Sequence, residues 1–126
     1  FRECDIVRGW WVQRILWDAG GRLLFRNSTV RHDRNSHDYY QDFLLEKKLY
    51  YEAPQFLNFL ATWRSEAPTF EARLQELAQG LADSGHWSQT NADMMRAWIA
   101  DLRSLNYTFP SLAPSQCTAG EQLCKV

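Results

Sequence analysis

Residues 9–30 read GWWVQRILWDAGGRLLFRNSTV, and this stretch decides how the chain begins to fold. Its Trp, Val and Ile residues favour strands. The sequence Asp18-Ala19-Gly20-Gly21 suits a tight turn, because glycine adopts positive φ without steric cost. Apolar runs flank this turn on both sides. We therefore expect an N-terminal β-hairpin in which residues 10–17 pair with residues 22–29.

The same stretch has a second interpretation, in which residues 3–18 form a helix. That helix would end at the two glycines, which suit a helix C-terminal cap. Gly9 in its middle and the poor separation of polar from apolar faces favour the hairpin instead. Since a two-stranded hairpin is not stable alone, it must pack against the rest of the chain.

Helical periodicity begins after Ser36. We expect Ser36 to cap a helix that reaches about residue 51, and Pro54 fits the first turn of a second helix. Pro68 is expected to start a third helix. Thr90 then opens a fourth helix with a sequence that resembles a capping box.

Gly85 is expected to end the third helix, and Pro110 and Pro114 make residues 107–126 an irregular tail. The predicted fold is mostly α (α+β), with about four antiparallel-packed helices and an N-terminal β-hairpin. The alternative is an all-α bundle whose N-terminal segment is helical. We expect a single domain over residues 1–126, with the hairpin at about 9–30, the helical region at about 36–106 and the tail at about 107–126.

Composition limits the classes of function. The chain has 126 residues and a net charge of −1, which gives no global electrostatic case for binding nucleic acid. No apolar run approaches the roughly 18 residues that a membrane span needs. We therefore expect no integral membrane segment in this chain, and a removed signal peptide or anchor stays open. Aromatic residues make up 14% of the chain, and such residues dominate both cores and binding surfaces.

Cysteine usage points to an oxidising compartment. Cys117 and Cys124 bracket TAGEQL in the polar tail, and Cys4 leaves the count odd, so the disulfide connectivity stays open. No close cysteine pair of the kind that zinc sites use is present. Asn27 and Asn106 begin sequences that match the N-glycosylation acceptor pattern. We expect a periplasmic or extracellular location, with the cytoplasm as the alternative.

Residues 31–42, RHDRNSHDYYQD, concentrate histidine and aspartate. His32 and His37 are five residues apart and would not share a helix face. Asp38, Asp42 and Glu46 do share one, and such a stripe is more often a solvated surface than a metal site. We assign no catalytic residue, metal or cofactor here. A small metal-dependent hydrolase using His37, Asp38 and Asp42 is an alternative hypothesis.

The N-terminal hairpin carries the strongest indication of a binding surface. Trp10 and Trp11 are adjacent, so in a strand they point to opposite faces, and one of them needs cover from elsewhere. The hairpin thus has more apolar side chains than one buried face can hold. We therefore predict a non-enzymatic protein-interaction domain of a secreted or periplasmic protein, of the inhibitor, immunity, effector or sensor type. Its expected partner is another protein. A helical bundle that binds a small apolar ligand is a further alternative. The predicted binding residues are Trp10, Trp11, Trp17, Arg14, Arg22 and Arg26.

Overall fold

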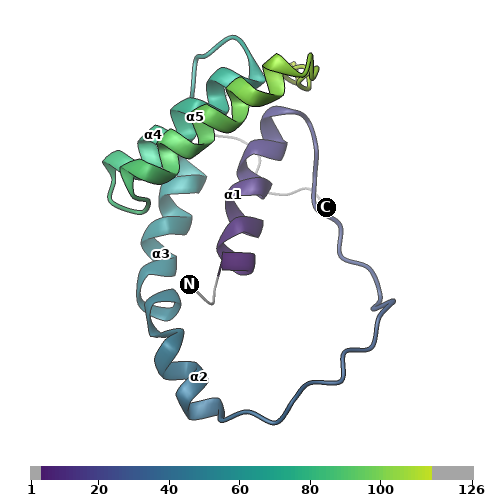
Figure 1. The fold of residues 1–126 in the computed structure, drawn as a ribbon, viewed down its shortest axis with the longest axis vertical. Helices are drawn as coiled ribbons and strands as arrows, with labels where there is room; N and C mark the ends of the chain where they lie inside the picture. Colours follow the sequence, from purple (N-terminus) through teal and green to yellow (C-terminus); the bar gives the residue numbers. More distant parts are fainter. Residues whose placement is uncertain (1–3, 115–126) are drawn as a thin grey trace. The chain divides into compact units, whose positions relative to one another are not determined.

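The computed structural model describes residues 4–114, and all regular structure in that part of the chain is helical (Figure 1). The prediction of a mostly α-helical chain is confirmed. The expected count of four helices is wrong, because residues 4–114 contain five. They are α1 (Cys4–Asp18), α2 (Tyr39–Leu45), α3 (Lys47–Thr62), α4 (Phe70–Asp83) and α5 (Gln89–Ser104).

The chain divides into two compact units. Unit 1 comprises Phe1–Ile15 and Arg22–Arg64, and unit 2 comprises Leu16–Gly21 and Ser65–Val126. Most of α1 therefore belongs to unit 1 with α2 and α3. The last turn of α1 belongs to unit 2 with α4 and α5.

The expected β-hairpin is wrong, because residues 4–18 form α1 and no strand occurs in residues 4–114. The Gly20 N–H donates to the Trp17 carbonyl at 3.1 Å, and the Gly21 N–H donates to the Leu16 carbonyl at 2.7 Å. Gly20 has φ of +73°. This bonding pattern is the Schellman closure of a helix. The two glycines thus end a helix, as the alternative interpretation expected, rather than turn a hairpin.

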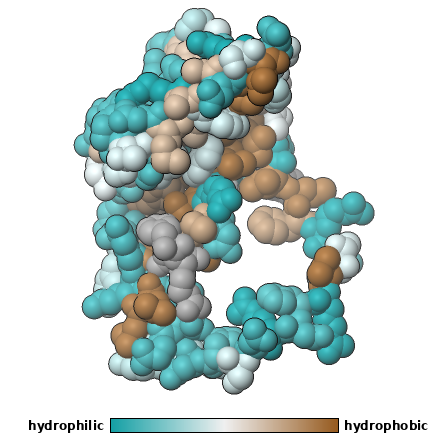
Figure 2. Space-filling view, viewed as in Figure 1, coloured by the Kyte–Doolittle hydropathy of each residue, from teal (hydrophilic) through white to brown (hydrophobic). Residues whose placement is uncertain are grey.

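The second arm of the expected hairpin has no regular structure. Residues 22–38 lie between α1 and α2 without helix or strand. Leu24, Phe25 and Val30 are exposed by 82%, 95% and 79%. Figure 2 shows apolar residues, in brown, along the segment that follows α1. Strand propensity alone did not produce a sheet, since a strand also needs a partner and a face to bury.

Asp38, rather than Ser36, caps α2. Its carboxylate accepts hydrogen bonds from the backbone N–H groups of Tyr40 and Gln41 at 2.9 and 3.2 Å. Helix α2 then ends at Leu45, and α3 begins two residues later. The single helix expected from Ser36 to about residue 51 is therefore split.

Pro54 lies inside α3 rather than in its first turn, so the predicted start of the second helix is wrong. Proline lacks the N–H that would bond one turn back, so the turn preceding Pro54 loses a hydrogen bond. Burial of Phe56 and Leu60, which follow Pro54 in α3, offsets the lost hydrogen bond. The Phe56 ring centroid lies 6.1 Å from that of Trp10.

Helices α4 and α5 lie side by side and form the core of unit 2 (Figure 1). The buried residues of α4 recur at i, i+3, i+4 and i+7, which places them on one face. From α5, Ala92 and Ile99 are buried completely. The buried residues of α4 are Leu74, Leu77, Ala78 and Leu81.

The caps of α4 and α5 correct the predicted boundaries. Thr69 caps α4, one residue after Pro68. Ser88 caps α5, so the helix starts before Thr90. Gly85 follows the end of α4 with φ of +77°, which confirms the expected stop. Asn106 follows α5 with φ of +57°, where a left-handed residue closes the helix.

Asp18 joins three parts of unit 2. Its carboxylate accepts a hydrogen bond from the Arg73 guanidinium at 3.1 Å, and its backbone carbonyl accepts one from the Ala113 N–H at 2.8 Å. Arg73 also donates to the Ala67 carbonyl at 3.0 Å. The last turn of α1 is therefore fixed to α4 and to the segment that follows α5.

None of the helices in residues 4–114 has the length and apolar character needed to cross a membrane. Cys4 is exposed. Cys117 and Cys124 lie outside the described residues, together with most of the predicted irregular tail.

Two glycines of the N-terminal region should respond in opposite ways to alanine. Gly9→Ala should stabilise the protein by roughly 0.5–1 kcal/mol, because Gly9 lies within α1 and an added Cβ meets nothing within 4 Å. Gly20→Ala should destabilise it by about 1–2 kcal/mol, because alanine disfavours positive φ. Urea unfolding midpoints measure both changes. Effects of the same sign would contradict the helical assignment.

Candidate functional site

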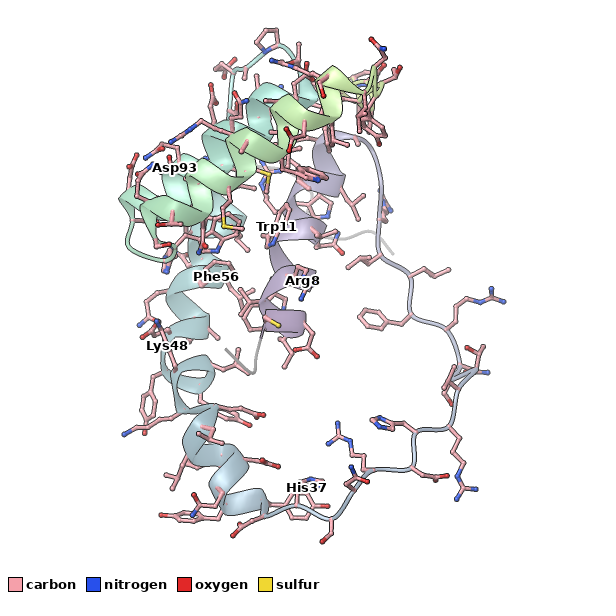
Figure 3. The ribbon with its side chains drawn as sticks, viewed as in Figure 1. Arg8, Trp11, His37, Lys48, Phe56 and Asp93 are labelled. Carbon is pink, nitrogen blue, oxygen red and sulfur yellow. The ribbon has the colours of Figure 1, made fainter. Side chains whose placement is uncertain are left out.

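The predicted binding tryptophans lie on α1. Trp10 and Trp11 are partly buried, whereas Trp17 is 50% exposed (Figure 3 labels Trp11). Trp10 and Trp17 are seven residues apart and share a helix face with Arg14, whereas Trp11 points elsewhere. Trp10 and Trp11 therefore do not face opposite sides of a sheet, contrary to our expectation. Whether these residues bind a ligand stays a prediction.

Arg14 lies in the interior of unit 1, although we expected it to flank an exposed surface. It is 5% exposed. Its guanidinium donates to the Trp63 carbonyl at 3.1 Å, and its Cζ lies 4.8 Å from the centroid of the Trp63 ring. The positive charge of a guanidinium is attracted to the face of an indole ring, and its N–H groups can still donate hydrogen bonds to a nearby carbonyl. Arg14 therefore holds α1 against the end of α3.

Arg22 and Arg26 are exposed, and their role in binding stays a prediction. They belong to the basic segment, which we define as residues 22–34. It contains four arginines and one aspartate. Arg31 pairs with that aspartate, Asp33, at 3.0 Å. The guanidinium groups of Arg22, Arg26 and Arg34 lie at the surface, where an anionic ligand could reach them.

His37 lies just before α2, next to the capping residue Asp38 (Figure 3). Its Nδ1 lies 2.9 Å from the Asn35 carbonyl, and its Nε2 lies 3.6 Å from the Asp42 carboxylate. The ring also meets Tyr39 edge-on, with centroids 4.7 Å apart. Both ring nitrogens thus face acceptor oxygens of the same segment, and the Asp38 carboxylate caps α2. Within residues 4–114, no group of three or more His, Cys, Asp and Glu side chains is placed to hold a metal ion.

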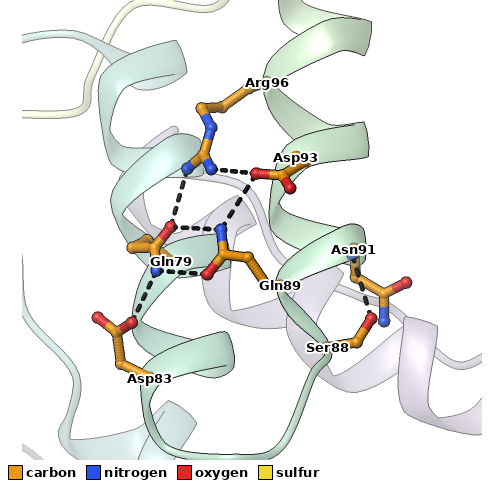
Figure 4. Close-up of polar contacts among 7 residues, drawn as sticks. All are labelled: Gln79, Asp83, Ser88, Gln89, Asn91, Asp93 and Arg96. Atoms are coloured by element: carbon orange, nitrogen blue, oxygen red, sulfur yellow. Dashed lines mark hydrogen bonds and ion pairs between the residues drawn. The ribbon is translucent and has the colours of Figure 1, made fainter.

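A cluster of planar polar side chains joins α4 and α5 (Figure 4). The side-chain amides of Gln79 and Gln89 bond to each other in both directions, at 3.1 and 3.2 Å. Gln79 donates to Asp83 at 2.7 Å, and Gln89 donates to Asp93 at 3.1 Å. Arg96 donates to Gln79 at 2.8 Å and pairs with Asp93. Three of these hydrogen bonds join a residue of α4 to a residue of α5, so the cluster holds the two helices together.

This cluster was not predictable from local sequence signals, because its two glutamines come from different helices. The available signal was the spacing of the acids: Asp83 and Asp93 each stand four residues after a glutamine. The hydrogen bond that Gln89 donates lowers the pKa of Asp93 below its ordinary value, and the hydrogen bond and positive charge of Arg96 lower it further. Asp93 is therefore an ionised acceptor at neutral pH.

Glu71 forms a second polar link between α4 and α5. Its carboxylate accepts a hydrogen bond from Arg103 at 3.1 Å, and 18% of its side chain is exposed. A bond from its own backbone N–H, in the first turn of α4, is the main reason that its pKa lies below 4.5, and Arg103 lowers it further. Partial burial acts in the opposite direction.

Comparison with known proteins identifies relatives across nearly the whole chain. Residues 2–121 match the model of the family described as STELLO glycosyltransferases. The chain is 32% identical over 108 residues to "Probable glycosyltransferase STELLO1" and 33% identical over 109 residues to "Probable glycosyltransferase STELLO2", both from Arabidopsis thaliana. Each alignment covers 86% of this chain but 14% of the relative. No solved structure matches.

These relatives correct the predicted function. A non-enzymatic protein-interaction domain of a secreted or periplasmic protein is wrong, because the matching family consists of glycosyltransferases. The alternatives of a metal-dependent hydrolase and a bundle that binds an apolar ligand are overturned by the same match. The expected periplasmic or extracellular location stays a prediction.

Removing the Arg14 side chain should be costly. Arg14→Ala should lower the free energy of unfolding by about 2 kcal/mol or more, because it removes the cation–π contact and the packing of a buried side chain. It also removes one of the two donors to the Trp63 carbonyl, which still accepts from Arg64 at 2.7 Å. The exposed Arg8 on the same helix is the control, and Arg8→Ala should change stability by less than about 0.5 kcal/mol. Chemical denaturation measures both variants. Equal, small effects would contradict the interior role of Arg14.

Glu71 should make the stability of the protein sensitive to acid. A carboxyl with a lowered folded-state pKa contributes stability above pH 4.5, which is lost as the pH falls through that lowered pKa. Glu71→Gln should therefore flatten the decline in urea midpoint between pH 5 and about pH 3. Arg103→Met should flatten it less, because the backbone bond is the larger cause. Parallel curves for the wild type and Glu71→Gln would contradict this.

Proposed function

Since the chain belongs to the STELLO family of glycosyltransferases, we propose that it forms one part of a longer enzyme that transfers a sugar from an activated donor to an acceptor. The single observation that supports this is the family match over residues 2–121. The chain corresponds to 14% of the length of its relatives, so the proposal concerns the contribution of this part to a larger catalytic unit.

Sugar transfer develops negative charge on the leaving group. An acceptor hydroxyl oxygen forms a bond to the anomeric carbon, the bond from that carbon to the leaving group breaks, and the hydroxyl proton passes to a base. Activated donors commonly carry a phosphate at the bond that breaks, and the leaving phosphate keeps the electron pair. Arginine side chains stabilise such charge through paired, charge-assisted hydrogen bonds.

The basic segment is the part of this chain that best suits a donor phosphate. Arg22, Arg26 and Arg34 are exposed. By contrast, Arg14 is committed to Trp63 and Arg73 to Asp18 and Ala67. In this proposal the anionic partner of the arginines is a phosphate. The expectation that nucleic acid is not a ligand stays a prediction.

Steady-state kinetics on the full-length protein test the proposal. The double variant Arg22→Gln/Arg26→Gln should raise KM for a nucleotide-sugar donor at least about tenfold, since each lost charge-assisted bond costs about 1.5–3 kcal/mol. Its melting temperature should match that of the wild type, because both residues are exposed. Arg8→Gln, an exposed arginine on α1, should leave KM unchanged.

Two results would count against the proposal at different levels. An unchanged donor KM in the double variant would reject the basic segment as the phosphate contact while leaving sugar transfer intact. A full-length wild-type protein that transfers no sugar from any phosphate-activated donor would reject sugar transfer itself.

A further inference from the structure

Helix α2 leaves all of its large apolar side chains at least partly exposed. Its sequence, YYQDFLL, includes five large apolar or aromatic residues among seven, and none of the seven is buried. Those five have exposed fractions between 43% and 79%. We call them the α2 face: Tyr39, Tyr40, Phe43, Leu44 and Leu45.

The start of α3 extends this apolar surface. The ring centroid of Tyr50 lies 5.2 Å from that of Phe43, and the Lys47 ammonium lies 5.6 Å from the Tyr51 ring. Tyr50 and Tyr51 are themselves 56% and 64% exposed. Figure 2 shows brown apolar residues where α2 meets α3. Within unit 1, α2 contacts α3 but not α1, so the α2 face is only partly covered there.

An exposed apolar patch of this kind normally marks a surface that packs against protein or lies on a membrane. The charges around α2 do not favour an anionic bilayer, which attracts clusters of Lys and Arg. Three acids and two lysines lie within residues 38–48: Asp38, Asp42, Glu46, Lys47 and Lys48.

A second copy of the chain is also a poor occupant. A stable interface buries about 800 Å² on each partner, which is much for a helix of seven residues to supply. The remaining source of cover is the rest of the polypeptide. The aligned relatives are far longer than this chain, which matches 14% of their length, so most of such a protein lies outside these residues.

We propose that the α2 face packs inside the longer STELLO-family protein, against an apolar segment of the same polypeptide that lies outside these 126 residues. The inference rests on the proposed place of the chain within a longer enzyme. It does not depend on which donor or acceptor that enzyme uses, because the contact concerns folding rather than sugar transfer.

Hydrogen–deuterium exchange on the full-length protein tests this contact. The amides of residues 41–45 should exchange at least about 100-fold more slowly than in an unfolded peptide, because tertiary burial suppresses local opening. The double variant Phe43→Asp/Leu44→Asp should reduce that protection at least about tenfold. Gln41→Asp adds a charge at an exposed polar position of the same helix and should leave the protection unchanged.

Three outcomes would overturn the proposal. Amides of α2 that exchange as fast as in an unfolded peptide would show that the face is uncovered. Protection that rises with protein concentration would assign the face to a second copy, and protection that appears only with anionic lipid vesicles would assign it to a bilayer. None of these results depends on enzyme activity, so each is distinguishable from a failure of the sugar-transfer proposal.

Discussion

The closure of α1 at Gly20 is the constraint on which the rest of the structure depends. A left-handed residue at Gly20 lets the N–H groups of Gly20 and Gly21 bond back to the carbonyls of Trp17 and Leu16. With the helix closed in this way, the Asp18 carboxylate accepts a hydrogen bond from Arg73 and its backbone carbonyl accepts one from the Ala113 N–H. A hairpin turn at the same glycines would have sent residues 22–29 back along residues 10–17, and both contacts of Asp18 would be lost.

The helical part of the chain was largely predictable because its signals are local. The apolar residues of α4 repeat at helical spacing from Leu74 to Leu81, and Gly85 ends that helix as expected. The boundaries were less predictable. Ser36 and Asp38 are both good capping residues, and only the path of the backbone decides that the Asp38 carboxylate reaches the amides of α2. Pro54 was expected to start a helix, yet packing of Phe56 and Leu60 carries α3 through it.

The N-terminal region was not predictable from local signals. Trp, Val and Ile favour strands, and a pair of glycines suits a hairpin turn and a helix cap equally well. The contact from Arg14 to Trp63, which packs α1 against the end of α3, joins residues 49 positions apart. Arg22 and Arg26 are exposed, whereas Arg14 was not recognised as interior. The family match spans residues 2–121, and no residue or motif that we singled out in the sequence indicated sugar transfer.

Backbone NMR over residues 4–30 tests the central claim most directly. We expect helical Cα shifts from residue 4 to residue 18, a coupling at Gly20 that reports positive φ, and no cross-strand contacts between residues 10–17 and 22–29. Extended-chain shifts over residues 10–17, together with cross-strand nuclear Overhauser effects to residues 22–29, would contradict that claim.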